Sequence, residues 1–168
     1  MNYTILRLTP VTALLLFLCS MVSTLAGERW PGVPFAEVRA YAWPADPATA
    51  AVILPGMALN PDVINKDGAR LTASQEGRLR AAVTGTFPAH PRALCYSPHN
   101  AFVFYDSARK PVAYIEVCFS CLGYKAEPRG TSQDYDLLTL AKLFEELKLP
   151  IGEYLTYAEF KKQFQARK

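Results

Sequence analysis

Alternating apolar and polar positions predict a strand at 36–43, and two largely apolar runs predict further strands at 100–106 and 112–119. The last two are rich in β-branched and aromatic residues, and only a short turn at Ser107 to Lys110 separates them. We therefore expect these two strands to form a β-hairpin at the centre of a small antiparallel sheet.

The length of that turn decides which residues face each other. If Ser107 pairs with Lys110 across a two-residue turn, Phe102 lies opposite Ile115 on an apolar face that meets the core. The same register places His99 opposite Cys118 on the other face, which carries more polar residues. Directly opposed side chains have Cβ atoms about 4.5–5.5 Å apart, so these two could share one metal ion.

Helical spacing predicts helices at 73–83 and 134–149, with a third, shorter one from Thr156 to about Gln165. Capping boxes open the first and the third, at Thr72-x-x-Gln75 and Thr156-x-x-Glu159. The fold class is therefore α+β, with a small antiparallel sheet and a central hairpin packed against two to three short helices.

Prolines and glycines predict the segments without regular structure. Three prolines and His90 keep 87–98 extended, and Gly123, Pro128 and Gly130 indicate a loop over 122–131.

The first 26 residues have the pattern of a secretory signal peptide. Arg7 is their only charge, an apolar stretch covers 11–22, and small residues lead to Ala26. The apolar stretch is too short for a typical spanning helix. We expect cleavage after Ala26, which leaves residues 27–168 as a single α+β domain in the periplasm or outside the cell. The alternative is an uncleaved segment that anchors the protein to the membrane.

Charge narrows the choice of partners. The full chain has a formal charge of +3, and loss of residues 1–26 removes only Arg7, which leaves +2. Lys161, Lys162, Arg167 and Lys168 gather at the C-terminus, without the basic stripe and interleaved aromatics of a nucleic-acid surface. We expect no nucleic-acid partner, whereas an unknown protein partner remains open.

The strongest chemical signal is a cluster of sulfur and nitrogen ligands around the predicted hairpin: Cys95, His99, Cys118 and Cys121. Three thiolates and one imidazole suit a closed tetrahedral site for Zn²⁺, and Cu(I) is also acceptable to such ligands. The metal interpretation therefore assigns all four residues to one ion.

Secretion favours a second interpretation, because an oxidising compartment converts thiols to disulfides. We expect Cys95 to pair with Cys121 or Cys118, since a bridge within Cys-x2-Cys strains the backbone unless a helix follows. A third interpretation takes Cys118-Phe-Ser-Cys121 as a redox-active dithiol. The residues after Cys121 are poor helix formers, which speaks against it.

Residues 95–151 resemble a family of uncharacterised secreted bacterial proteins. The matching stretches are Cys95-Tyr-Ser-Pro-His99, Phe102-Val-Phe-Tyr-Asp106, Ile115-Glu-Val-Cys-Phe-Ser-Cys121 and Leu143-Phe-Glu-Glu-Leu-Lys-Leu-Pro-Ile151. The resemblance covers about a third of the chain and implies no activity. It implies that the hairpin and its cysteines form one unit.

Other catalytic patterns are absent from the sequence. There is neither a Gly-x-Ser-x-Gly elbow nor a glycine-rich phosphate loop, and Glu116 is expected to be a solvated sheet carboxylate. We predict no catalytic residue and no organic cofactor, and lean against an enzyme.

Three functions follow from these patterns. The leading one is a small exported, non-catalytic protein whose Cys/His hairpin binds zinc or is stapled by a disulfide. The alternatives are a periplasmic inhibitor or immunity protein that blocks a secreted toxin or hydrolase, and a thiol-disulfide oxidoreductase.

Overall fold

In the computed structural model of the protein, residues 30–44, 51–54, 58–152 and 156–167 are described. The predicted signal segment and its cleavage point lie outside these residues. No helix in the described part of the chain is long and apolar enough to cross a membrane.

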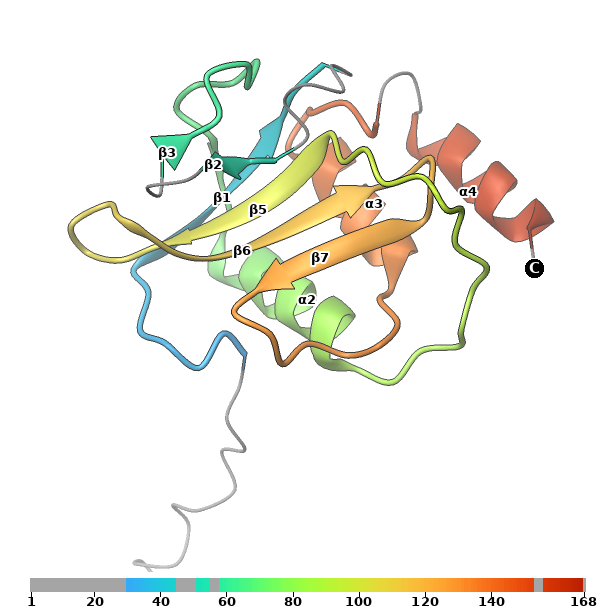
Figure 1. Ribbon diagram of the computed structural model, residues 1–168, viewed down its shortest axis with the longest axis horizontal. Helices are drawn as coiled ribbons and strands as arrows, with labels where there is room; N and C mark the ends of the chain where they lie inside the picture. The colour runs from blue at the N-terminus through green and yellow to red at the C-terminus, as the bar shows by residue number, and fades with distance from the viewer. Residues whose placement is uncertain (1–29, 45–50, 55–57, 153–155, 168) are drawn as a thin grey trace, which may run out of the picture.

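A five-stranded antiparallel sheet forms the centre of the fold, with α2 and α3 on one of its faces and α4 beside the end of the central strands (Figure 1). Its strand order is β4-β1-β5-β6-β7, and β2 and β3 form a separate two-stranded sheet. The strands are β1 (Glu37–Ala42), β2 (Ile53–Leu54), β3 (Ala58–Leu59), β4 (Ala69–Arg70), β5 (Asn100–Tyr105), β6 (Pro111–Cys118) and β7 (Gly123–Glu127). The helices are α2 (Ala73–Thr84), α3 (Leu137–Glu146) and α4 (Tyr157–Ala166). The predicted α+β class is confirmed.

The main core lies between the sheet and the helices, as the apolar face of the hairpin predicts. Phe102 and Ile115 face each other across β5 and β6 and are fully buried. The Phe102 ring packs against Phe144 of α3, with ring centroids 4.6 Å apart. Phe119 joins Phe144 to Phe160 of α4 through edge-to-face contacts. These aromatic contacts fix α3 and α4 against the end of the hairpin.

The opposite face of the sheet is more buried than the sequence predicts. A second apolar cluster covers it, made of Tyr41, Trp43, Val52, Ile53, Val63, Ala101, Val103 and Tyr105. Residues 51–54 and 58–63, which include β2 and β3, supply the cover. The prediction of a solvent-exposed face is therefore wrong for the end of the hairpin near β2. A segment with little periodicity in its apolar positions folds back over it.

The hairpin turn is one residue longer than predicted, yet the register in the core is the predicted one. Asp106 N–H donates to Lys110 O at 3.0 Å, so Asp106 and not Ser107 pairs with Lys110. Arg109 takes a positive φ of 59°, as in a three-residue turn with a left-handed residue. A shift between Phe104 and Tyr105 then restores the pairing of Phe102 with Ile115.

The loop predicted over 122–131 contains a strand. Residues 123–127 pair with β6, from Cys118 opposite Gly123 to Tyr114 opposite Glu127. Tyr124 and Ala126 alternate with Lys125 and Glu127, an amphipathic pattern that suits an edge strand. Gly123 is the first residue of the strand and Pro128 follows its last residue, so neither prevents the strand from forming.

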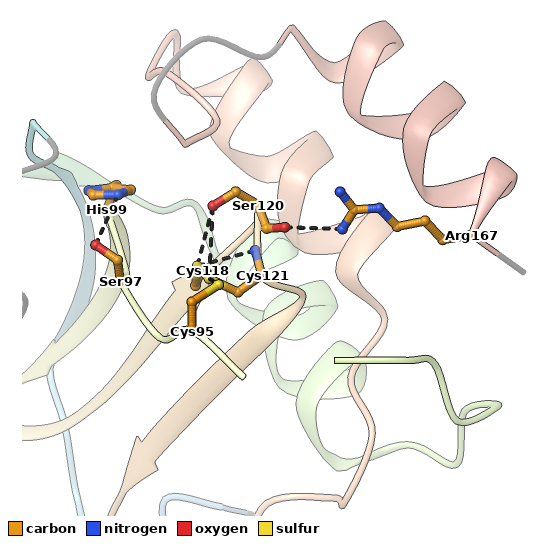
Figure 2. The surroundings of a disulfide bond; sticks show 7 residues. All are labelled: Cys95, Ser97, His99, Cys118, Ser120, Cys121 and Arg167. Carbon is orange, nitrogen blue, oxygen red and sulfur yellow. Dashed lines mark hydrogen bonds between the residues drawn. A yellow bond between two sulfur atoms is a disulfide. The ribbon is translucent and has the colours of Figure 1, made fainter. Parts of the chain in front are cut away.

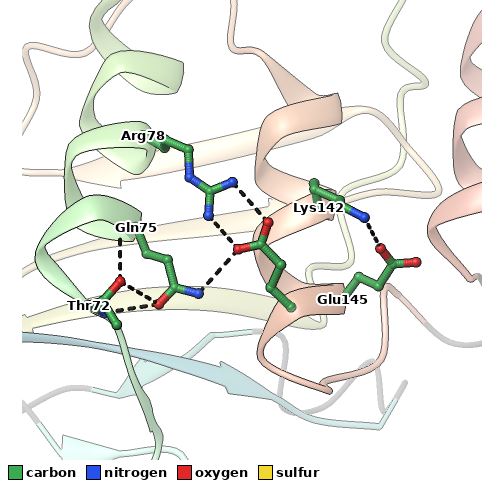
Figure 3. A network of polar contacts seen from close by, with 6 residues as sticks. Thr72, Gln75, Arg78, Lys142 and Glu145 are labelled. Carbon is green, nitrogen blue, oxygen red and sulfur yellow. Dashed lines mark hydrogen bonds and ion pairs between the residues drawn. The ribbon is translucent and has the colours of Figure 1, made fainter.

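Both predicted capping boxes are present, and the first leads into a polar network between α2 and α3 (Figure 3). Gln75 N–H donates to the Thr72 hydroxyl, and the Gln75 side chain also reaches Glu146 of α3. Arg78 makes a bidentate pair with the same carboxylate. Helix α3 itself is shorter than predicted, because Asp136 caps it by accepting from Thr139 N–H.

The Glu146 carboxylate should give a pH-dependent contribution to stability. Its hydrogen bonds with Arg78 lower its pKa to about 2. The contribution is complete above the ordinary value of 4.5 and is lost as the pH falls towards 2. Because the side chain is 31% exposed, we expect Glu146→Gln to cost only about 0.5–1 kcal/mol at pH 7.

Urea unfolding of both proteins at pH 7 and pH 2.5 measures this difference. The matched control is Glu145→Gln, which removes only a pair with Lys142 on the same helix and should cost less. Equal losses for the two variants, or a Glu146→Gln deficit that does not shrink at pH 2.5, would contradict the assignment.

Candidate functional site

The candidate site forms where the extended segment 91–99 crosses the turn between β6 and β7 (Figure 2). Ala93 N–H donates to Cys121 O at 3.0 Å, which ties the segment to the turn. Pro91 and Pro98 favour the extended backbone that lets it lie there. The segment itself is largely exposed between Pro91 and Tyr96.

All three described cysteines meet at this crossing. Cys118 is the last residue of β6, and Cys121 lies in the turn that follows. Their Cα atoms are 5.4 Å apart, within the usual range for a disulfide, and their sulfurs are bonded. The Sγ atom of Cys95 lies 2.9 Å from Sγ of Cys121. The site therefore contains a disulfide and a neighbouring thiol.

The observed disulfide differs from the predicted pairing of Cys95 with Cys121 or Cys118. The prediction assumed that a Cys-x2-Cys bridge needs a following helix. Here a tight turn between two antiparallel strands brings the two cysteines together, with Leu122 at a positive φ of 55°. Cys95 still reaches Cys121, but as the free thiol.

Polar groups surround the sulfur of Cys118. Cys121 N–H donates to it at 3.3 Å, and the Ser120 hydroxyl oxygen lies 3.5 Å away. Arg167, at the end of α4, donates from Nη1 to Ser120 O at 3.0 Å and brings a positive charge to the turn (Figure 2). Such donors stabilise a thiolate if the disulfide opens.

His99, unlike the other three predicted ligands, contacts Ser97. Its ring is buried, and Nε2 lies 3.4 Å from the Ser97 hydroxyl (Figure 2). The β5–β6 ladder ends at Asn100 opposite Val117, one pair before the predicted match of His99 with Cys118. The structure thus brings the three cysteines together and pairs His99 with Ser97.

Over residues 30–44, 51–54, 58–152 and 156–167, no group of three or more His, Cys, Asp and Glu side chains is arranged to hold a metal ion. A metal ion binds cysteine as the thiolate, whereas two of the three sulfurs here are joined in a disulfide. The oxidised site and a zinc site therefore exclude each other, and the zinc prediction concerns the reduced protein.

Glu116 lies beside the cysteines and is not the solvated carboxylate that the sequence predicts. It is on β6, two residues before Cys118 and so on the same face, and its exposed fraction is 2%. Its Oε1 atom accepts from Val52 N–H at 2.6 Å, and its side chain hydrogen-bonds to Tyr96. Sequence reasoning missed this burial because the covering segment around Val52 has no strong periodicity.

Burial raises the pKa of Glu116, against the opposing influence of Val52 N–H and Lys125. Both folded and unfolded chains are protonated below the ordinary value of 4.5. As the pH rises, the unfolded chain ionises first, so stability falls until the folded pKa is passed. Glutamine keeps the acceptor for Val52 N–H but does not titrate. Glu116→Gln should therefore abolish this loss and gain stability relative to wild type as the pH rises from 4.5.

Urea unfolding at pH 4 and pH 8 tests this expectation. The relevant quantity is the change in unfolding free energy between the two pH values. Identical changes for wild type and Glu116→Gln would show that the carboxyl does not titrate with a raised pKa. Glu127→Gln, an exposed change on the neighbouring strand, is the matched control and should follow wild type.

Tyr96 completes the site and was not singled out by sequence reasoning. Its ring lies against Gly123, where a Cβ atom would come within 3.1 Å of Cδ2. The absence of a side chain at Gly123 thus lets Tyr96 lie close to β7, next to Cys95.

Comparisons with protein-family models, with curated proteins and with solved structures found no match. The resemblance to secreted bacterial proteins stays a prediction. At the site itself, a free thiol touches a disulfide.

Proposed function

We propose that the mature protein is a small exported thiol–disulfide exchange protein. The observation that carries the proposal is the 2.9 Å separation between Sγ of Cys95 and Sγ of Cys121, which is bonded to Cys118. Exchange proceeds by attack of a thiolate on a disulfide sulfur. A thiol already in contact with a disulfide supports this chemistry directly.

Two further features support exchange over a purely structural staple. Cys95 is exposed, so it can meet a thiol or disulfide of another molecule. Hydrogen-bond donors at Cys118 favour the thiolate that reduction releases. The signal pattern at residues 1–26 would deliver the protein to a compartment in which disulfides form and persist.

Thiol counting and an exchange assay test the proposal. Mature protein purified after export should contain one reactive thiol when denatured, and two more after reduction. The reduced protein should cleave insulin disulfides faster than a variant with Cys95, Cys118 and Cys121 all replaced by serine. Equal rates for the two proteins would reject exchange as the function.

A zinc or Cu(I) site is the second candidate, supported by the convergence of three sulfurs from two separate segments. In the reduced protein Cys95, Cys118 and Cys121 could bind one soft metal ion, with His99 as the predicted fourth ligand. Metal analysis of the exported protein distinguishes the candidates. About one zinc ion with three thiols per chain favours the metal site, and no metal with one thiol favours exchange.

A further inference from the structure

The three cysteines differ sharply in their exposure to solvent. Cys118 is fully buried and Cys121 is 2% exposed, whereas Cys95 is exposed. A thiol on another protein therefore has little access to either sulfur of the Cys118–Cys121 disulfide. It does have access to Cys95.

We propose that Cys95 relays the buried disulfide to the surface, an inference that rests on the proposed exchange function. The Cys95 thiolate attacks Sγ of Cys121, and a Cys95–Cys121 disulfide forms as the Cys118–Cys121 bond breaks. Cys118 leaves with the electron pair and takes up a proton equivalent to the one that Cys95 lost. One thiol and one disulfide are present before and after, so the step needs no external oxidant or reductant.

Contacts on both sides of Cys95 hold the attacking sulfur in place. Ala93 N–H is bonded to Cys121 O, and the ring of Tyr96 lies against Gly123 in the next strand. The attacking and attacked sulfurs are therefore carried by backbone segments that are fixed to each other. Such positioning makes an exchange step effectively unimolecular.

Hydrogen-bond donors also stabilise the leaving group, which is the sulfur of Cys118. Cys121 N–H and the Ser120 hydroxyl both lie within hydrogen-bonding distance of Sγ of Cys118. They stabilise the negative charge that develops on this sulfur when the bond to Cys121 breaks. The buried position then protects the Cys118 thiol from other molecules while the disulfide is at the surface.

The relayed disulfide has one sulfur on an exposed residue, which defines its substrate class as a thiol carried by a polypeptide. A partner thiolate attacks Sγ of Cys95, forms a mixed disulfide with it and releases Cys121 as a thiolate. Leu94 is fully exposed and Tyr96 is 42% exposed, so Cys95 sits between two apolar side chains that a peptide can contact. Cys95 and its two neighbours thus form an open surface suited to a chain segment, beside the two buried cysteines.

Reaction with a cysteine-containing decapeptide, followed by mass spectrometry of the mixed disulfides, tests the relay. In the oxidised wild type the peptide should attach to Cys95. Cys95→Ser keeps the Cys118–Cys121 disulfide but should react roughly tenfold more slowly or worse. Cys118→Ser should form a Cys95–Cys121 disulfide and still attach the peptide at Cys95. Ser97→Ala, a matched change in the same segment, should react like wild type.

The outcomes separate the relay from the proposed function. If Cys95→Ser reacts as fast as wild type, the relay is wrong and direct exchange at Cys118–Cys121 stands. If wild type reacts no faster than the variant with all three cysteines replaced, the exchange function itself fails. Near-UV circular dichroism of each variant identifies any loss of reaction that comes from misfolding.

Discussion

Replacing Cys121 with serine should remove both the disulfide and all exchange by the protein. Cys121 is bonded to Cys118 and is also the sulfur that touches Cys95, so each disulfide of the proposed relay requires it. Denatured Cys121→Ser should show two reactive thiols before reduction where wild type shows one. Its rate of insulin reduction should fall to that of the variant without cysteines.

The matched control is Ser120→Ala in the same turn, which keeps all three sulfurs and removes only the hydroxyl near Cys118. It should keep one reactive thiol and measurable exchange. Full exchange by Cys121→Ser would mean that the reaction takes place at Cys95 or Cys118 alone, and would contradict the site as described.

Replacing Phe102 with alanine should produce the largest loss of stability. This side chain is fully buried, lies opposite Ile115 and packs on Phe144. Truncation of a buried phenylalanine removes favourable burial and leaves a cavity, at a cost of about 3–5 kcal/mol. Urea unfolding at pH 7 should show this loss as a lower midpoint with little change in slope.

Leu94→Ala provides the comparison, because Leu94 is as apolar but fully exposed. Its effect on the free energy of unfolding should stay within about 0.5 kcal/mol. Similar losses for the two variants would show that the core is not where β5, β6 and α3 meet.

The hairpin and its core face could be predicted because local pattern and tertiary burial agree there. Phe102 and Ile115 lie in runs rich in β-branched and aromatic residues, and their predicted pairing is confirmed despite the longer turn. Strand β7 could not be recognised in the same way, because Gly123 and Pro128 at its two ends outweighed the alternation between them. Pairing with β6 decides its structure, and that pairing is a tertiary contact.

The candidate site could likewise be predicted only where the local sequence determines it. Sequence spacing identifies Cys95, Cys118 and Cys121 as one group, and they do meet. It does not determine which two bond, since that depends on the turn after β6 and on where the 91–99 segment lies. The burial of Glu116 depends on Val52, 64 residues away, which no local pattern encodes.

The strand order has a consequence for the route by which this chain folds. Strands β5, β6 and β7 are consecutive in sequence and adjacent in the sheet, whereas β1 pairs with β5 across a long sequence separation. The hydroxyls of Tyr41 and Tyr105, for example, are hydrogen-bonded although the residues are 64 positions apart. Closing so long a loop costs more entropy than closing a hairpin, so we expect the three-strand meander to form first and β1 to dock on it later. The cysteine cluster belongs to the early part, which allows its oxidation before the sheet is complete.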